Sequence, residues 1–239
     1  MANTRNMDAL NKQQQEVNME LINAVRDRRS IRKFKPDRIP RNVLEGIFDA
    51  ARWAPSWGNT QSCEFFILTG QPLEEFRRAR FEKTSSKAPF IPDIPMPEAW
   101  PDAQKKRYGE IGKIMFTALD IKRDDKEGRN RFYQDMARIF DAPCLAVACI
   151  PSGVLVEYAL LDVGLMLQTV CLLAPEKGLG TCIMAAAVGY PELLRKIASI
   201  PDDRKIVVGI AMGYPDLDHP INQFERARIG MEEFVRWVE

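Results

Sequence analysis

The stretch from Tyr158 to Ala174 is apolar around most of the circumference of a helix, and it constrains the fold more than any other part of the sequence. A surface helix needs only one apolar stripe, so this segment has to pack on several sides. We expect a central helix, with a subunit interface as one candidate for its outer side. Its core, residues 159–174, is interrupted by Asp162 and Gln168 and falls short of the roughly 20 residues of a bilayer span. We therefore expect no transmembrane helix.

Shorter apolar patterns predict the elements around this helix. Apolar residues recur with helical spacing at 19–27 and again after Pro40. The second of these apolar stripes ends at Ala54-Pro55. Continuous apolar runs predict strands at 65–69, 144–150, 179–184 and 206–212, and Pro191 begins a helix before the last of them. The expected fold mixes α and β structure in a single domain that spans residues 1–239.

Residues 83–140 are expected to be an elaboration of this domain. Their first part excludes a continuous helix or a central strand, because it carries Pro89, Pro92, Pro95, Pro97 and Pro101. Two charged, helix-compatible stretches follow at about 103–122 and 129–140, with a break at 124–128.

The charges of the chain nearly balance. With 34 Lys and Arg against 33 Asp and Glu, the net charge is +1, so no overall field favours nucleic acid or an anionic membrane. Neither is an expected partner, and any anion site has to be local. Residues 1–20 are polar and lack the apolar segment of a secretory signal, so we expect a cytoplasmic protein.

Cysteine and histidine usage indicates where the chemistry does not reside. The five cysteines form no C-x-x-C pair and lie mostly in apolar runs, which is typical of reduced core residues. The single histidine, His219, leaves little for a His-containing zinc site or a Ser-His-Asp triad. We predict no metal site and no catalytic side chain, and we expect a cofactor to supply any chemistry.

The first candidate binding motif is a local excess of positive charge. Between residues 27 and 41 there are seven basic and two acidic residues, beginning with Arg28, Arg29, Ser30 and Arg32. Such a run is often a solvated face that complements the negative end of a helix dipole. Alternatively it binds phosphate, because guanidinium groups pair with phosphate oxygens and a serine hydroxyl adds a neutral donor.

The second motif is the loop at 54–61, between a helix and a strand. Turn residues alone explain it as a plain connection. It also combines the indole ring of Trp57 with the amides of Asn59 and Gln61, which can read the edge of a planar heterocycle.

Two further motifs lie late in the chain. In the sequence GLGTC at 178–182, Gly178 suits a helix C-cap and Gly180 admits close packing; no Rossmann fingerprint is present. Near the end, Arg226 and Arg228 form an R-x-R pair, a pattern that most often is surface charge.

Together, and in this order, the four motifs resemble the FMN-dependent nitroreductase family. They are RRSIR at 28–32, P-S-x-x-N-x-Q at 55–61, GLGTC at 178–182 and R-x-R at 226–228, and the resemblance runs from about 21 to 237. It implies an α+β, nitroreductase-like fold with a mostly antiparallel central sheet flanked by helices. It also implies an intertwined homodimer with FMN at the subunit interface.

The resemblance assigns one group of residues to the phosphate end of FMN. Arg28, Arg29 and Ser30 would hold the phosphate and the ribityl chain, and Arg226 and Arg228 would close on the phosphate. Residue chemistry agrees, because a phosphate of about −1.5 to −2 charge matches two or three arginines.

A second group is assigned to the flavin ring. Arg32 would face the ribityl chain or the N1 and O2 edge, and backbone N–H groups at Met184 and Ala185 would point at N5 and O4. A cation near N1 stabilises the anionic reduced flavin. Four residues would come from the other subunit, with stacking rather than hydrogen bonding by the tryptophan: Pro55, Ser56, Trp57 and Asn59.

The implied activity is hydride transfer from NADH or NADPH through flavin N5 to a nitroaromatic, a quinone or a similar small-molecule acceptor. Dehalogenation, enal reduction, consumption of the flavin itself and a non-enzymatic dimeric interaction module remain alternatives. The resemblance also suggests that residues 83–140 cap the open face of the flavin. Anchoring of their aromatic side chains on the body is an equal alternative.

Overall fold

A four-stranded antiparallel sheet forms the centre of the computed structural model, which describes residues 20–239. The strand order is β1-β2-β4-β3, from β1 (Glu64–Thr69) through β2 (Cys144–Pro151) and β4 (Arg204–Gly213) to β3 (Gly180–Met184). One register shift, between Ala148 and Cys149, interrupts the β2–β4 pairing. All four predicted strands and the mostly antiparallel sheet are confirmed.

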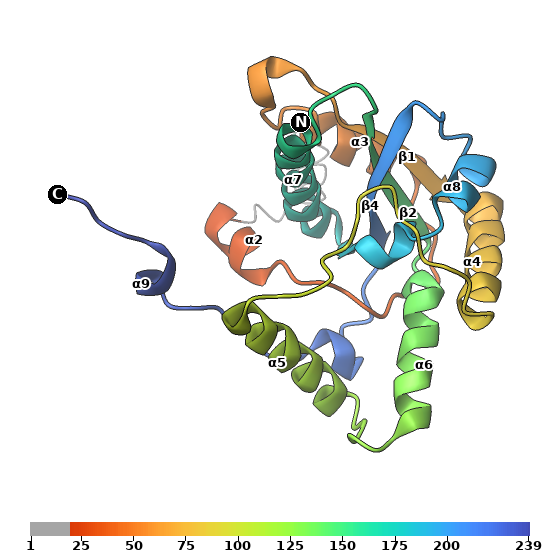
Figure 1. Cartoon of the computed structure of the whole chain (residues 1–239), viewed down its shortest axis with the longest axis vertical. Coiled ribbons are helices and arrows are strands. Elements are labelled where there is room, and N and C mark those ends of the chain that lie inside the picture. The colour runs from red at the N-terminus through yellow and green to blue at the C-terminus, as the bar shows by residue number, and fades with distance from the viewer. Residues whose placement is uncertain (1–19) are drawn as a thin grey trace, which may run out of the picture.

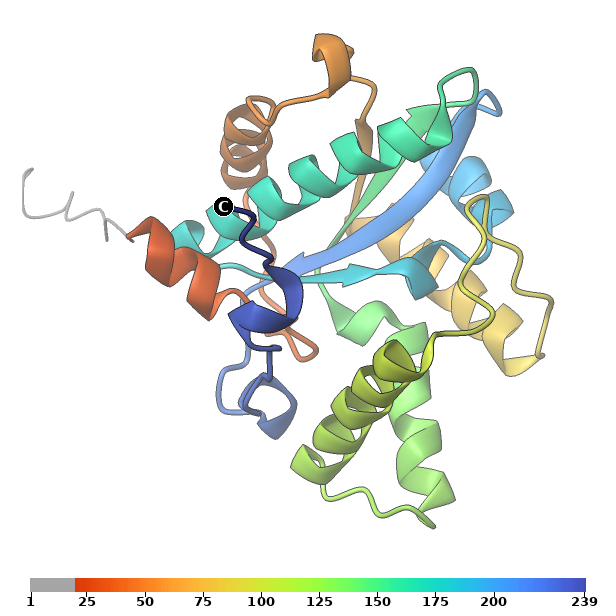
Figure 2. The same ribbon diagram turned by 60° about the vertical axis from the view of Figure 1, so that its left-hand side comes forward.

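Helices cover both faces of this sheet (Figures 1 and 2). One face packs on α3 (Arg41–Ala51) and α7 (Val156–Leu173), and the other on α4 (Gly70–Ser85), α6 (Lys126–Ala137) and α8 (Pro191–Ala198). Successive residues of β2 point to opposite faces of the sheet. Ala146 belongs to the core under α3 and α7, and Val147 to the core under α4, α6 and α8. A strand that is apolar on both faces reads as a continuous apolar run, which is how the sequence presents it.

The longest helix corrects one expectation about length. Helix α7 continues into a 3-10 turn (Ala174–Lys177), which extends the helical segment to 22 residues, Val156–Lys177. With a mean hydropathy of 1.6 over an 18-residue window, this segment is long and apolar enough to cross a membrane. The argument that this segment is too short is therefore wrong. Its inner side packs on the sheet through Val163 and Val170, while Leu161 and Leu165 on its outer side are exposed.

Helix α4 is the element that sequence patterning missed. It follows β1 at once, and the residues that it buries are Leu73, Phe76 and Arg80. The expected break at 124–128 is also partly wrong, because α6 begins at Lys126 after an N-cap in which Asp125 accepts the Gly128 N–H at 2.8 Å.

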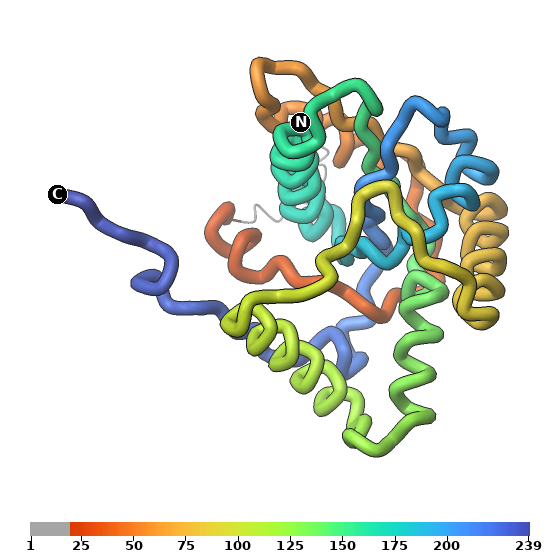
Figure 3. Tube along the Cα trace, in the orientation of Figure 1, coloured from red at the N-terminus to blue at the C-terminus, as the bar shows by residue number. Residues whose placement is uncertain are grey.

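The proline-rich segment crosses from the end of α4 to the start of α5 (Asp102–Ala118) without regular structure (Figure 3). It is anchored on the body. The ring of Phe90 occupies the space that a Cβ on Gly189 would need, and Asp93 pairs with Arg195 at 2.7 Å and accepts the Ile206 N–H at 2.8 Å.

The first and last helices of the described residues are next to the basic motifs in the sequence. Helix α2 (Leu21–Asp27) precedes the 28–32 motif, and α9 (Met231–Phe234) follows the R-x-R pair and stands away from the body with the chain end (Figure 1). The polar segment at 1–19, on which the absence of a signal was argued, and the predicted helix start at Met19 lie outside the described residues.

Candidate functional site

Two adjoining cavities of about 990 and about 880 Å³ lie beneath α5. Arg32 lines both, as do Ile111, Lys113 and Thr117 of α5. We call the smaller one the basic cavity and the larger one the aromatic cavity. Arg32 therefore stands where a ligand that extends from one cavity into the other has to pass.

The basic cavity collects two motifs that are almost 200 residues apart in the sequence. Arg28, Arg29, Ser30, Arg226 and Arg228 all line it. In total seven basic and two acidic residues of the described chain surround this space. Burial lowers the pKa of Arg226, and the nearby guanidinium groups of Arg29, Arg228 and Arg28 lower it further. The positive charges of this cluster therefore repel one another, and the binding of an anion in the cavity would reduce that repulsion.

The arginines of this cluster have different partners. The guanidinium of Arg29 donates to the carbonyl oxygens of Asn222 and Phe224, and that of Arg226 donates to those of Arg26 and Arg28. These two arginines tie the N-terminal motif to the C-terminal one. Within residues 20–239 the Arg28 side chain makes no hydrogen bond or ion pair, and Arg228 bonds only the adjacent carbonyl of Ala227, at 2.7 Å.

Asn222 organises the same junction and had no role in the sequence prediction. It is 1% exposed. Its Oδ1 accepts the Arg32 N–H at 2.8 Å, and its Nδ2 donates to the carbonyl oxygens of Lys33 and Asp216 at 2.8 Å each. The sequence shows an asparagine in the fourth motif, but only the fold shows that its side chain ties residues 32 and 33 to Asp216.

The 28–32 motif reaches the cavities because it runs along β3. The Ile31 N–H donates to the Thr181 carbonyl at 2.8 Å, and a Cβ on Gly180 would lie 2.4 Å from Ile31 Cγ1. Close packing at Gly180 is therefore confirmed, as is Gly178 as a left-handed cap (φ 69°). Any side chain at position 180 would collide with Ile31 and disturb the contact between this motif and the strand.

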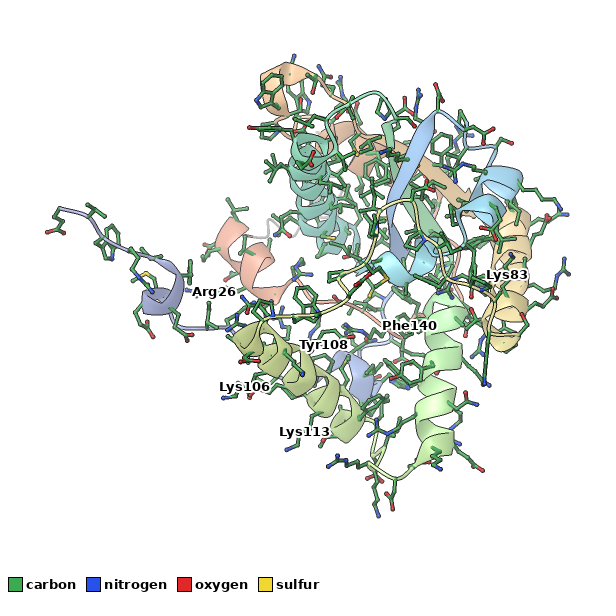
Figure 4. The ribbon with its side chains drawn as sticks, in the orientation of Figure 1. Arg26, Lys83, Lys106, Tyr108, Lys113 and Phe140 are labelled. Carbon is green, nitrogen blue, oxygen red and sulfur yellow. The ribbon has the colours of Figure 1, made fainter. Side chains whose placement is uncertain are left out.

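The aromatic cavity has its floor at the end of β3 and its walls on α5 and α6. Met184 and Ala185, which sequence reasoning assigned to a ring edge, lie in the floor with Arg32 beside them. Tyr108 comes from α5 and Phe140 from the turn beyond α6, so that they belong to different walls (Figure 4). The other aromatic residues of the walls are Phe116, Phe132 and Tyr133. A flat, mostly apolar ligand fits such walls.

Arg80 of the unpredicted helix α4 supports this floor. It is 3% exposed, and its guanidinium donates to the carbonyl oxygens of Met136 at 3.0 Å, Ala137, and Ala186 at 2.7 Å. Burial lowers its pKa to about 10, so the side chain is still charged at neutral pH. It links the end of α6 to the residue that follows Ala185. No sequence motif marks this position.

The 54–61 loop lies elsewhere in the same chain. Pro55, Ser56, Trp57 and Asn59 line neither cavity. The Trp57 N–H donates at 2.9 Å to Asp162, a carboxylate that is 6% exposed on α7, and the indole ring packs on Tyr158 at 5.8 Å. The indole itself is 65% exposed. The loop is thus held against α7 by one hydrogen bond and one ring contact, while its indole is exposed.

The thiols and metal-binding groups offer no alternative centre. Burial raises the pKa of Cys63, Cys144 and Cys149 to about 12, so these thiols are protonated and poor nucleophiles at neutral pH. Among residues 20–239 there is no group of three His, Cys, Asp or Glu side chains that could hold a metal ion.

Comparison with known proteins identifies the family of this fold and these motifs. The model of the nitroreductase family matches residues 25–214, which include the basic motif, the 54–61 loop and β1 to β4. The chain belongs to the nitroreductase family. The predicted nitroreductase-like α+β fold is confirmed with it.

Three relatives of this nitroreductase family member give the comparison its detail. A 4-nitrobenzoate reductase of Nocardioides sp. (strain LMS-CY) is 30% identical, over 90% of this chain and 88% of its own. A nitrobenzene nitroreductase of Ectopseudomonas oleovorans is 31% identical, over 90% and 95%. The crystal structure of the FMN and NADPH-dependent nitroreductase NfnB from Sphigopyxis sp. strain HMH has a TM-score of 0.88 and 29% identity, and covers 92% of this chain and 100% of its own.

Proposed function

We propose that this chain is an FMN-dependent oxidoreductase that passes hydride from NADPH or NADH to nitroaromatic or similar acceptors. The observation that carries the proposal is the pair of adjoining cavities, one basic and one aromatic, that meet at Arg32. FMN has the matching layout, with an anionic phosphate at one end and a planar ring at the other.

The residues fit FMN by their charge. The basic cluster has more positive charge than the described chain neutralises, and it lowers the pKa of its own Arg226. A phosphate of about −1.5 to −2 charge offsets that repulsion through charge-assisted hydrogen bonds. Within residues 20–239, Arg28 makes no side-chain hydrogen bond and Arg228 only one, so both have donors available for a phosphate, and Ser30 lines the same cavity. Arg29 and Arg226 hold the two motifs in place around them.

The chain's other contributions concern the ring. When bound, FMN supplies hydride transfer through N5. Arg32, fixed by Asn222, places a cation at the passage between the cavities and so favours negative charge on the adjacent ring edge. The backbone at Met184 and Ala185, fixed through Arg80, offers N–H groups, and the walls of α5 and α6 exclude water. No side-chain acid or base is required.

We further propose that the site is completed in a homodimer. Pro55, Ser56, Trp57 and Asn59 of the partner subunit would reach the ring, because in their own chain they line neither cavity. Large apolar side chains on α2, α7 and the C-terminal segment are exposed, as an intertwined dimer interface requires: Ile22, Tyr158, Leu161, Phe234 and Trp237.

Three finer points complete the proposal. Residues 1–239 form one nitroreductase-like domain, in which residues 83–140 cap the flavin. The part of this elaboration that lines the aromatic cavity consists of α5, the turn after it, α6 and Phe140, whereas residues 83–101 line neither cavity. With NAD(P)H as donor and α7 packed on the sheet, we place the protein in the cytoplasm, without a membrane or nucleic-acid partner.

One experiment tests the proposed function. The purified protein should show the visible absorption of bound flavin, lose it on anaerobic addition of NADPH or NADH, and regain it when nitrobenzene is added. Both nucleotides are compared at equal concentration, with free FMN as the control. A colourless protein that takes up no added FMN would contradict the proposal.

A further inference from the structure

The aromatic cavity carries a marked imbalance of charge. Among the described residues that line it, Asp120 is acidic, whereas five are basic: Arg32, Lys113, Lys122, Arg123 and Arg129. Only Arg32 and Lys113 also line the basic cavity, so three of these cations serve the aromatic cavity alone. A neutral nitroarene makes no use of them, because clustered cations attract anionic ligands.

Arg129 is the best placed of the three. Its guanidinium carbon lies 4.6 Å from the centre of the Phe116 ring, and Phe116 meets Phe132 edge to face at 5.4 Å. Its Nε is buried, and within residues 20–239 this atom has no hydrogen-bond partner and no carboxylate forms an ion pair with the guanidinium. A partly buried guanidinium with unused donors is costly unless an anion meets it.

The local fold holds this guanidinium in place. Arg129 lies in the first turn of α6, where Asp125 caps the helix and a Cβ on Gly128 would lie 2.3 Å from Asp125 Oδ2 and 3.1 Å from Ile121. The turn between α5 and α6 is therefore packed tightly against the helix start. Stacking on Phe116 then fixes the planar group beside the aromatic walls.

We propose that Arg129, with Lys122 and Arg123 in the same cavity wall, binds the carboxylate of an aromatic carboxylate acceptor. This inference rests on the proposed function and names its substrate class as anionic nitroaromatics, with nitrobenzoates preferred over neutral nitroarenes. The guanidinium offers a carboxylate two parallel hydrogen bonds, while Phe116 and Phe132 contact the ring of the same acceptor.

The test is steady-state kinetics of the holoenzyme with 4-nitrobenzoate and nitrobenzene. In Arg129→Gln the ratio of kcat/KM for 4-nitrobenzoate to that for nitrobenzene should fall about 10- to 100-fold, mainly through KM, because a charge-assisted pair is lost. Arg129→Lys should restore part of the ratio. Arg131→Gln is the matched control, since Arg131 lies on the same helix, pairs with Glu127 at 3.9 Å and lines neither cavity.

Calorimetric binding of benzoate and benzamide separates this inference from the proposed function, because neither compound has to be reduced. The purified protein should bind benzoate more tightly than benzamide, and Arg129→Gln should remove the difference. An unchanged ratio in Arg129→Gln, or equal losses for both acceptors, overturns the inference. A different result in Arg129→Gln also overturns the inference: a KM that rises for NADPH and is unchanged for NADH and for 4-nitrobenzoate. That result would assign Arg129 to the 2′-phosphate of NADPH. A wild-type protein that reduces neither acceptor but binds benzoate more tightly than benzamide would overturn the proposed function and its substrate class, and would leave only the binding of an aromatic carboxylate at Arg129.

Discussion

Arginine side chains around the basic cavity divide into two kinds, and the division decides what each substitution should do. Among residues 20–239, Arg28 and Arg228 have donors that no other side chain or carbonyl uses fully, whereas Arg29 and Arg226 donate to backbone carbonyls. Loss of a ligand-binding arginine should weaken FMN binding without unfolding the chain. Loss of a carbonyl-binding one should also loosen the junction between the two ends of the chain.

We therefore expect Arg28→Ala and Arg228→Ala each to raise the Kd for FMN by about 10- to 100-fold, since each removes a charge-assisted hydrogen bond worth about 1.5 to 3 kcal/mol. Fluorescence titration with FMN measures this. Arg131→Ala serves as the control, because Arg131 lies outside both cavities. Unchanged affinity in both variants would show that the phosphate lies elsewhere.

Buried thiols make the stability of the chain depend on pH in a defined direction. Burial raises the pKa of Cys144 from 9.0 to about 12. The folded state therefore holds this proton more tightly than the unfolded state, and the stabilisation is complete below pH 9.0 and is lost as the pH rises toward 12. The difference in unfolding free energy between the wild type and Cys144→Ala should be constant below pH 9.0 and shrink above it. Urea unfolding checks this, and a difference independent of pH would contradict it.

At this scale the sequence predicted where positive charge gathers but not what each side chain binds. The clustered arginines at 28–32 and 226–228 can be recognised in the sequence, and the structure brings both segments to the basic cavity. That Asn222 fixes Arg32 depends on contacts between residues 190 positions apart, which no local pattern records.

Helices α4 and α7 show what patterning captures and what it misses. The sequence identifies α7 because a helix that is apolar on every side has to be packed on several sides, whereas a surface helix needs only one apolar stripe. Helix α4 was missed because its buried stripe is short and includes the charged Arg80. Hydrogen bonds to three carbonyl oxygens from other elements offset the cost of burying this side chain. A prediction from hydrophobic periodicity counts only apolar residues, so it fails to detect a helix that buries a charged one.

The contact between α7 and the 54–61 loop should couple stability to flavin binding. Asp162→Leu removes the acceptor for the Trp57 N–H, which should cost roughly 1 to 3 kcal/mol of stability and also weaken FMN binding, because the loop reaches the partner's ring in our proposal. Asp162→Asn keeps an acceptor oxygen and should have a much smaller effect. Urea unfolding and FMN titration measure both quantities. If the leucine variant matches the wild type in both, the loop is not held by this carboxylate.

The apolar surface that residues 20–239 expose favours a dimer over a monomer. It includes the outer side of α7, α2 and the C-terminal segment, where Trp237 is 76% exposed. We expect a dimer at micromolar protein concentration, with loss of FMN when it dissociates. Sedimentation equilibrium with absorbance detection reports both mass and bound flavin. A monomeric mass that retains FMN would show that one chain completes the site.

The central claim is that the two cavities together hold one FMN molecule, with its phosphate in the basic cavity. Titration of the flavin-free protein with FMN and with riboflavin, which differ only in the phosphate, tests this most directly. Two or more charge-assisted contacts should make FMN bind at least about 100-fold more tightly than riboflavin. Equal affinities for the two flavins would contradict the account.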